Sequence, residues 1–328
     1  MHHIELRSHL GQEVLDDILG LIEAATRIEG HRPVGEHKYS HLAVGALNWV
    51  GVLAYEGDRL VGYAHTRWNA WTGPEPPRPR MAVEIVVHPD RYDSDVATTL
   101  LQETRNVLAR AGGGLYYLWV HRVEDANETL AARLGLRVQR ELAFMVRPMN
   151  TLHADVPLPE GVELRPYRER VDDSEFLRVN NAAFEGHPEN GGWDEAEFAD
   201  RRSRDWFDAE GLLMAWQGTR LLGFHWTKWH GHSSDEVPAH EPVGEVYVLA
   251  VDPAVRGAGL GRSLLAAGLR HLYGRGCRQA ILYVDCANTG AVALYSSEGF
   301  EVVSREVCYE DSVEPAGLES PTELLRPA

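Results

Sequence analysis

The stretch that decides the fold is residues 245–265, which read EVYVLAVDPAVRGAGLGRSLL. Its first part, residues 246–251, is a short apolar run, and Asp252-Pro253 follows it, which predicts a buried strand and its exit turn. A helix is predicted next, and three glycines between strand and helix leave the backbone open to a ligand. Because the first N–H groups of a helix have no intrahelical partner, the segment predicts a site for a phosphate or pyrophosphate.

Two common phosphate-binding loops do not fit this stretch. A P-loop has Lys after its last glycine and a dinucleotide fingerprint has a further glycine there, whereas this chain has Arg262. The pattern Arg256-x-x-Gly259-x-Gly261 instead resembles the acyl-CoA pyrophosphate loop of the GNAT acetyltransferases. Downstream, a predicted strand, a short helix over residues 288–295 and Gly299-Phe300 follow in the order of that family.

Composition places the chain among soluble proteins of two domains. It has 328 residues, 44% of them hydrophobic and 25% charged. The net charge of −17 argues against binding to nucleic acid, and no segment predicts a leader or a membrane span, so we expect a cytoplasmic protein. The three cysteines lack zinc or disulfide spacing and are expected in or near the core, so no metal is predicted. Nothing in the sequence implies an oligomer.

Two halves of the chain repeat one order of elements. Gly218-Thr-Arg-Leu-Leu-Gly-Phe224 echoes Gly57-Asp-Arg-Leu-Val-Gly-Tyr63 at an offset of 161 residues. The predicted fold class is therefore α/β, with two tandem GNAT domains, each a mixed, mostly antiparallel sheet flanked by helices. We place the N-terminal domain at residues 1–150 and the C-terminal domain at 151–328, with a flexible tail over 311–328.

The N-terminal half is expected to begin with helices and to continue with a run of antiparallel strands, after which helices and strands alternate. Helices are predicted over 14–28, 37–47, 94–111 and 127–134, and strands over 49–55, 59–68, 83–87 and 115–120.

The N-terminal copy lacks the residues that the resemblance requires. Opposite Arg256, Gly259 and Gly261 it has Tyr92, Asp95 and Ala97. We therefore expect the N-terminal domain to be non-catalytic and do not expect its loop to hold acetyl-CoA. The resemblance implies acetyl-CoA as the co-substrate of the C-terminal domain. The cofactor-binding residues that it implies are Leu249, Ala250, Val251, Arg256, Gly257, Ala258, Gly259, Leu260, Gly261, Arg262, Ser263, Asn288 and Tyr295.

Acyl transfer to an amine needs a proton acceptor, a donor to the thioester oxygen and an acid for the leaving thiolate. The resemblance implies the N–H of Leu249 as the oxyanion donor and Tyr295 as the acid. Glu245 stands at even spacing from Tyr247 and Leu249, so their side chains are expected on one face, with Glu245 accepting the proton directly or through water. The alternatives are a surface glutamate, a core tyrosine and, for Asn288, a helix cap.

Motifs outside the loop indicate the acceptor. Gly223-Phe-His-Trp-Thr-Lys228, Gly244-Glu-Val-Tyr247 and His187-Pro-Glu-Asn-Gly-Gly-Trp193 resemble the mycothiol synthases, tandem GNAT enzymes that acetylate the cysteinyl amine of cysteinyl-glucosaminyl-inositol. The substrate-binding residues that the resemblance implies are Glu36, Glu189, Lys228, Glu245 and Tyr283. Trp193 and Trp226 either stack on the sugar or belong to the core.

Two other functions stay open. One is a GNAT enzyme acting on another small amine, such as an amino sugar, an antibiotic or a peptide, and the other is a non-catalytic acyl-CoA-binding protein. The segment 229–243 holds His230, His232 and His240, and we interpret it as an exposed loop because the spacing does not match a zinc site.

Overall fold

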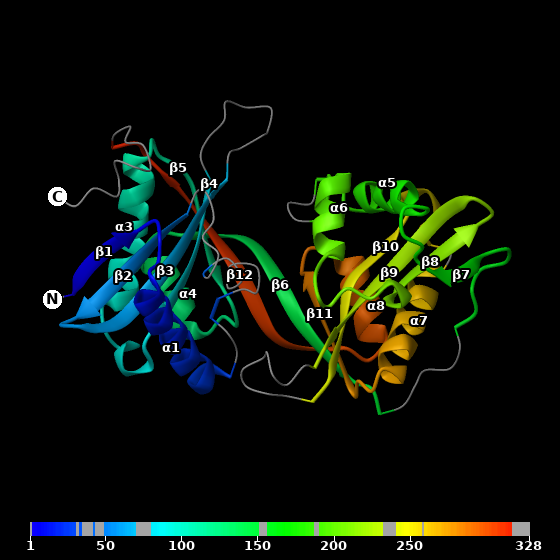
Figure 1. Cartoon of the computed structure of the whole chain (residues 1–328), viewed down its shortest axis with the longest axis horizontal. Coiled ribbons are helices and arrows are strands. Elements are labelled where there is room, and N and C mark those ends of the chain that lie inside the picture. Colours follow the sequence, from blue (N-terminus) through cyan, green and yellow to red (C-terminus); the bar gives the residue numbers. More distant parts are fainter. Residues whose placement is uncertain are drawn as a thin grey trace. The chain divides into compact units, whose positions relative to one another are not determined.

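A computed structural model of the chain shows two compact units (Figure 1). It describes residues 2–30, 33–34, 42, 49–69, 80–150, 156–186, 190–231, 241–257 and 259–316. Unit 1 comprises residues 1–142 and the chain from residue 304 on, and unit 2 comprises residues 143–303.

Unit 1 is a sheet with a helix on each face. Its strand order is β1-β2-β3-β4-β5-β12, and only β4 and β5 run parallel among these neighbours. α1 packs its apolar stripe on one face and α3 packs on the other, which gives the unit two hydrophobic cores. The elements are β1 (His3–Arg7), α1 (Gln12–Glu29), β2 (Trp49–Glu56), β3 (Arg59–Asn69), β4 (Arg80–Val87), the 3-10 turn η1 (Pro89–Arg91), α3 (Val96–Arg110), β5 (Gly114–Val120), α4 (Asp125–Arg133) and the start of β6 (Arg137–Pro148).

Unit 2 has the same arrangement, with strand order β6-β11-β10-β9-β8-β7 and the pair β10 and β11 parallel. α5 and α6 cover one face with an aromatic core, and α7 and α8 cover the other with an aliphatic one. The elements are β7 (Glu163–Pro166), α5 (Asp173–Ala183), α6 (Glu195–Arg202), η2 (Ala209–Gly211), β8 (Leu212–Gln217), β9 (Arg220–His230), β10 (Val243–Val251), η3 (Pro253–Val255), α7 (Leu260–Gly274), β11 (Gln279–Asp285), α8 (Thr289–Ser297) and β12 (Glu301–Val313).

The repeat is visible at the level of single hydrogen bonds. In unit 1 the Thr66 hydroxyl donates to the carbonyl oxygen of Val50 at 2.7 Å. In unit 2 the Thr227 hydroxyl donates to the carbonyl oxygen of Gly211 at 2.8 Å. Each residue of the second pair stands 161 residues after its counterpart in the first, which is the offset that the sequence predicts. The predicted mixed, mostly antiparallel α/β fold is confirmed.

Two strands cross the division between the units. β6 leaves unit 1 after Leu142, and β12 returns to unit 1 from Ser304. The units therefore differ from the expected division at residues 150 and 151. β12 also runs to Val313, opposite Gly114 of β5, so residues 311–313 belong to the sheet and not to the expected tail. The helix predicted over 37–47 lies outside the described residues, apart from Leu42.

Candidate active site

The site forms where the two parallel strands of unit 2 diverge. β10 pairs with β11 only from Val243, opposite Gln279, to Glu245, opposite Ile281. On its other side β10 continues to pair with β9 as far as Val251. Within the described strands, the later backbone groups of β10 thus have an open edge toward β11, and N–H groups at such an edge can bind a ligand.

A β-bulge in β10 decides which side chains face which core. Val246 lies opposite Thr227 and Val248 lies opposite Trp226, so Tyr247 is the additional residue. Tyr247 and Val248 pack with the aromatic core, whereas Leu249 packs with the aliphatic clusters under α7. The prediction that Leu249 shares a face with Glu245 and Tyr247 is wrong, because the bulge shifts the alternation by one residue.

Glu245 lies in a compact polar group at the start of the diverging edge. It faces Lys228 across the β9–β10 ladder, and its Oε2 lies 2.6 Å from Nε2 of His230. Burial opposes the charged carboxylate, but the hydrogen bond from His230 and the charge of Lys228 outweigh burial and lower the pKa of Glu245. Glu245 is therefore an ionised, mostly buried carboxylate at neutral pH.

Lys228 shares this face and is itself buried. Its Nζ lies 4.9 Å from the ring centre of Trp206 and 5.9 Å from that of Tyr247, so aromatic faces and the Glu245 carboxylate surround the ammonium. Trp193 and Trp226 are buried in the aromatic core, which supports the core interpretation for both.

The loop before α7 has the conformation of an anion site. Gly257 has φ +92° and Gly259, the N-cap of α7, has φ +79°, and both values favour glycine. A Cβ added at either position would meet no atom within 4 Å, so both backbones border open space. The N-cap of α7 supplies no side-chain hydrogen bond, which leaves the first turn available to an anion. Ala258 lies outside the described residues, and the Arg256 guanidinium donates to the carbonyl oxygen of Ala183 at 3.3 Å.

Two expected phosphate ligands in α7 have other partners. Arg262 contacts Glu298 at 3.0 Å and Ser297 Oγ at 3.1 Å, which ties α7 to the end of α8. Ser263 is buried, and its hydroxyl donates to the carbonyl oxygen of Pro157 at 2.8 Å. The Ser263 hydroxyl is therefore not available to a phosphate, contrary to the expectation.

α8 positions the candidate acid. Asn288 caps the helix, since its side chain accepts a hydrogen bond from the N–H of Ala291 at 3.1 Å. Tyr295 is buried against Phe300, with ring centres 5.9 Å apart, and burial raises the pKa of Tyr295. The phenol therefore remains protonated through the neutral range.

Of the expected substrate residues, Lys228 and Glu245 come together, and Tyr283 lies on the neighbouring strand. Tyr283 is two residues beyond Ile281, the partner of Glu245, and its side chain is 47% exposed and packs on Phe144. The positions of Glu36 and Glu189 lie outside the described residues.

An ion network around the buried Asp252 supports the turn between β10 and the loop, and the sequence interpretation missed it. Asp252 accepts from Arg178 at 2.8 Å and from Arg220 at 3.0 Å, and its other oxygen accepts from the N–H of Ala254. Burial opposes its charge, but these donors lower the pKa of Asp252 to about 2. Arg178 and Asp252 stand 74 residues apart, and no local pattern in the sequence connects them.

His230 was also missed as a site residue. It was interpreted as part of an exposed loop, but it ends β9 and contacts Glu245. His232 and His240 lie outside the described residues. Among the residues that the structure describes, no group of three or more His, Cys, Asp or Glu side chains is placed to hold a metal, and no helix is long and apolar enough to cross a membrane.

Comparisons with known proteins agree with this geometry. A sequence profile of the Acetyltransferase (GNAT) family matches residues 176–300. A mycothiol acetyltransferase from Nocardia farcinica is 41% identical to the chain, over 92% of the chain and 95% of the relative. One from Catenulispora acidiphila is 40% identical over 89% and 94%, and one from Mycobacterium marinum is 37% identical over 97% and 100%. The chain belongs to the mycothiol acetyltransferase family.

Solved structures show the same fold for this acetyltransferase. A GCN5-related N-acetyltransferase from Sphaerobacter thermophilus superimposes with a TM-score of 0.70 at 20% identity. The superposition covers 97% of this chain and 98% of the Sphaerobacter chain. A tandem GNAT protein from the clavulanic acid pathway superimposes with a TM-score of 0.72 at 15% identity, over 96% and 100%. Both likenesses support the tandem GNAT architecture.

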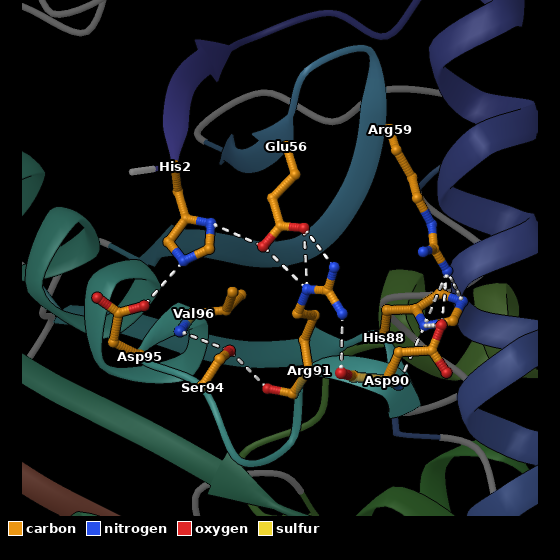
Figure 2. Close-up of polar contacts among 9 residues, drawn as sticks. All are labelled: His2, Glu56, Arg59, His88, Asp90, Arg91, Ser94, Asp95 and Val96. Carbon is orange, nitrogen blue, oxygen red and sulfur yellow. Dashed lines mark hydrogen bonds and ion pairs between the residues drawn. The ribbon is translucent and has the colours of Figure 1, made fainter.

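In unit 1 of the acetyltransferase, ion pairs occupy the loop that corresponds to the anion site (Figure 2). Arg91 donates to both carboxylate oxygens of Glu56 at 2.6–2.9 Å. His2 lies 2.8 Å from Asp95 and 3.6 Å from Glu56, so it connects the two carboxylates (Figure 2). Asp95 is the N-cap of α3, at the position where unit 2 has Gly259. This loop presents carboxylates to the start of its helix, which disfavours a pyrophosphate there.

The diverging strands of unit 1 hold a different polar group. β4 pairs with β5 only as far as Val83, and the next residue is the buried Glu84. His121 lies between Glu84 at 3.2 Å and Glu306 at 3.1 Å, one carboxylate at each ring nitrogen. Burial opposes the charge of the imidazolium, but the two carboxylates raise the pKa of His121 to about 10. Beside its diverging strands, unit 1 therefore holds an imidazolium between two carboxylates.

Proposed function

We propose that the enzyme transfers the acetyl group of acetyl-CoA to the cysteinyl amine of 1D-myo-inositol 2-(L-cysteinylamino)-2-deoxy-glucopyranoside, the last step of mycothiol biosynthesis, and that unit 2 carries the reaction. The observation that carries the proposal is the ionised Glu245 at the point where β10 leaves β11. The acceptor is the one implied by the name of relatives that match almost the whole chain.

The residues of unit 2 fit acetyl-CoA. The open space over Gly257 and Gly259 and the uncapped first turn of α7 suit its pyrophosphate. The open edge of β10 suits the extended pantetheine arm, because exposed N–H and C=O groups pair with amides of the same kind. In this proposal the co-substrate supplies the activated acyl group, and the residues of the chain bind it and move protons.

Each candidate side chain has a chemical role that its surroundings support. Glu245 accepts a proton from the substrate ammonium, directly or through water, since an attacking amine needs a free lone pair. The N–H of Leu249 donates to the thioester oxygen as negative charge develops on it. Tyr295, which burial keeps protonated, donates to the departing sulfur.

The polar face around Glu245 suits a hydroxyl-rich amine. The resemblance also implies Glu36, Glu189 and Tyr283 for binding of the acceptor, and the proposal keeps these three assignments. Carboxylates accept hydrogen bonds from sugar and inositol hydroxyls and pair with an ammonium. Lys228 donates from a buried position beside the base.

A panel of amines tests the acceptor. The enzyme is incubated with acetyl-CoA and the cysteinyl pseudodisaccharide, glucosamine, an aminoglycoside or a short peptide, and acetylated products are measured by mass spectrometry. We expect the cysteinyl compound to give kcat/KM at least ~100-fold above the others, about 2.7 kcal/mol of discrimination. Turnover of another amine in its place would replace this acceptor, and binding of CoA without any product would favour a binding protein.

The variant Glu245→Gln tests the base in the same assay. Loss of a general base typically costs about 10²-fold or more, so kcat should fall by that order while the affinity for acetyl-CoA stays within about threefold. Glu84→Gln is a matched control, because Glu84 is also a buried glutamate next to a histidine where parallel strands diverge. We expect the Glu84→Gln enzyme, assayed at temperatures below its melting temperature, to have the kcat of the wild type. A large loss of CoA affinity in Glu245→Gln would place the residue in cofactor binding instead.

A further inference from the structure

His230 occupies a defined place beside the candidate base. It is the last residue of β9, opposite Val243, and two residues beyond Lys228, so its side chain lies on the face of Glu245. The side chains of His230 and Glu245 are 17% and 13% exposed, and 2.6 Å separate Nε2 from Oε2. This short contact makes the two side chains one unit for proton transfer.

The proton balance of the proposed reaction requires an exit from this pocket. Attack of the amine forms a C–N bond and breaks the C–S bond of the thioester. The substrate ammonium loses one proton before the attack and a second one afterwards. The leaving thiolate takes one proton, so the other must reach solvent on each turnover.

Glu245 alone is poorly suited to pass on that proton. Its surroundings favour the carboxylate, and the lowered pKa makes it a weak base that holds a proton only briefly. Imidazole is the side chain that changes its protonation near neutral pH. A second group directly on Glu245 can therefore hold the proton between the substrate and the solvent.

A different histidine–glutamate group in unit 1, beside its diverging strands, shows what prevents such exchange. His121 has a carboxylate at each ring nitrogen, which keeps the imidazolium protonated. In unit 2 His230 contacts Glu245, and Lys228 lies on the same face of the sheet, opposite Glu245. Tyr247 of β10 also interacts electrostatically with Glu245 and Lys228, and Arg201 of α6 acts on Tyr247.

We propose that His230 is a positioning and proton-relay residue that acts through Glu245: it orients the carboxylate, takes up the proton that Glu245 receives from the ammonium and releases it to solvent. The inference rests on the proposed function of unit 2. It requires only an ammonium acceptor and does not depend on the rest of the acceptor's structure.

Two variants separate the relay from a structural role. His230→Gln places an amide N–H near the Nε2 position and keeps a hydrogen bond to Glu245, but it cannot carry a proton. We expect kcat to fall about 10–100-fold, within the range of general acid–base effects, with the affinity for acetyl-CoA unchanged. His230→Ala should lose as much, and added imidazole should restore at least a tenth of the wild-type rate.

The control is His271→Gln, because His271 also pairs with a carboxylate, Asp208, at 3.2 Å and lies on α7. We expect wild-type kcat for it. Wild-type kcat/KM for His230→Gln from pH 6 to 9 would overturn the inference, and so would a slow His230→Ala that imidazole does not restore.

The proposed function fails in a different way. If the wild-type enzyme acetylates another amine, the acceptor is wrong and the His230 variants are measured with that amine. If the wild-type enzyme acetylates no amine, both the function and the relay are wrong.

Discussion

His225 shows how one buried side chain connects a strand to a helix. Its Nδ1 donates to the carbonyl oxygen of Leu264 at 2.9 Å, and its ring lies over Gly268 of α7. A Cβ at Gly268 would lie 2.0 Å from Nδ1, so only glycine lets the ring pack there. Burial outweighs the hydrogen bond to Leu264, and the pKa of His225 falls to about 4.

This imidazole predicts a loss of stability in weak acid. The folded pKa of about 4 lies below the unfolded value of about 6.5. Between these pH values the unfolded chain binds a proton that the folded chain does not, so the free energy of unfolding falls as the pH drops. The full effect is about 3 kcal/mol, from 1.36 kcal/mol per pKa unit.

Urea denaturation at pH 7 and pH 4.5 measures the effect, with the fluorescence of unit 2 tryptophans as the signal. His225→Gln should show a smaller difference between the two pH values than the wild type. The control His3→Gln, at an exposed position of unit 1, should match the wild type. An unchanged pH dependence in His225→Gln would contradict the assigned pKa.

Single residues were predictable where one motif carried them. The motif Gly244-Glu-Val-Tyr247 indicated Glu245, and the structure places it opposite Lys228, which a separate motif indicated. His230 was missed because its role depends on the register of β9 against β10, which brings residues 15 apart into contact. Turn type and loop length indicate the register of a short hairpin, but the segment between β9 and β10 is too long for that inference.

At the scale of elements, the turn from β10 into the anion loop depends on the Asp252 network. Arg178 of α5 donates to Asp252 and, at 2.7 Å, to the carbonyl oxygen of Leu221, so it joins the helix, β9 and the turn. Asp252 in turn receives the N–H of Ala254 in η3. These bonds set where the chain leaves the sheet before Gly257 and Gly259.

Loss of this network should weaken cofactor binding more than chemistry. Arg178→Met removes one of the three donors to Asp252 and leaves a buried carboxylate with fewer partners. We expect KM for acetyl-CoA to rise about tenfold, which is about 1.4 kcal/mol, while kcat stays within twofold of the wild type. The KM of Arg178→Lys should lie between those of the wild type and Arg178→Met. Calorimetric titration with CoA provides the direct measurement. Arg204→Met, which breaks an exposed pair with Asp200, is the control. A fall in kcat with unchanged KM would place the role of Arg178 in the chemical step.

The elements themselves were largely predictable, and their irregularities were not. Alternation and turn residues predicted the hairpin of β2 and β3 and the strand, loop and helix order around α7. The bulge at Tyr247 was not predictable, because Val246, Tyr247 and Val248 all suit a regular strand. One additional residue was enough to move Leu249 to the other face.

At the scale of the whole molecule, duplication did not produce two continuous domains. β12 starts in unit 2 and pairs with β5 of unit 1 from Val307 to Val313. His121 of unit 1 also depends on Glu306 of the same strand. The sequence repeat predicted two copies, but a repeat cannot show that the last strand returns to the first copy. Residues 1–150 alone therefore lack a strand of their own sheet.

The contrast between the two loops predicts one molecule of acetyl-CoA per chain. In unit 1 Arg91 is committed to Glu56, and Asp95 stands at the helix start (Figure 2). A carboxylate there repels a pyrophosphate and removes the benefit of the helix dipole.

The variant Gly259→Asp places the same residue type at the start of α7 in unit 2, in a conformation that Asp tolerates better than most side chains. Isothermal titration should give a stoichiometry near one for the wild type and for Asp95→Gly, and at least a 100-fold weaker affinity for Gly259→Asp. Two equivalents in the wild type would show that unit 1 binds acetyl-CoA despite its carboxylates. One tight equivalent in Gly259→Asp would contradict the expected repulsion by a carboxylate at the start of α7.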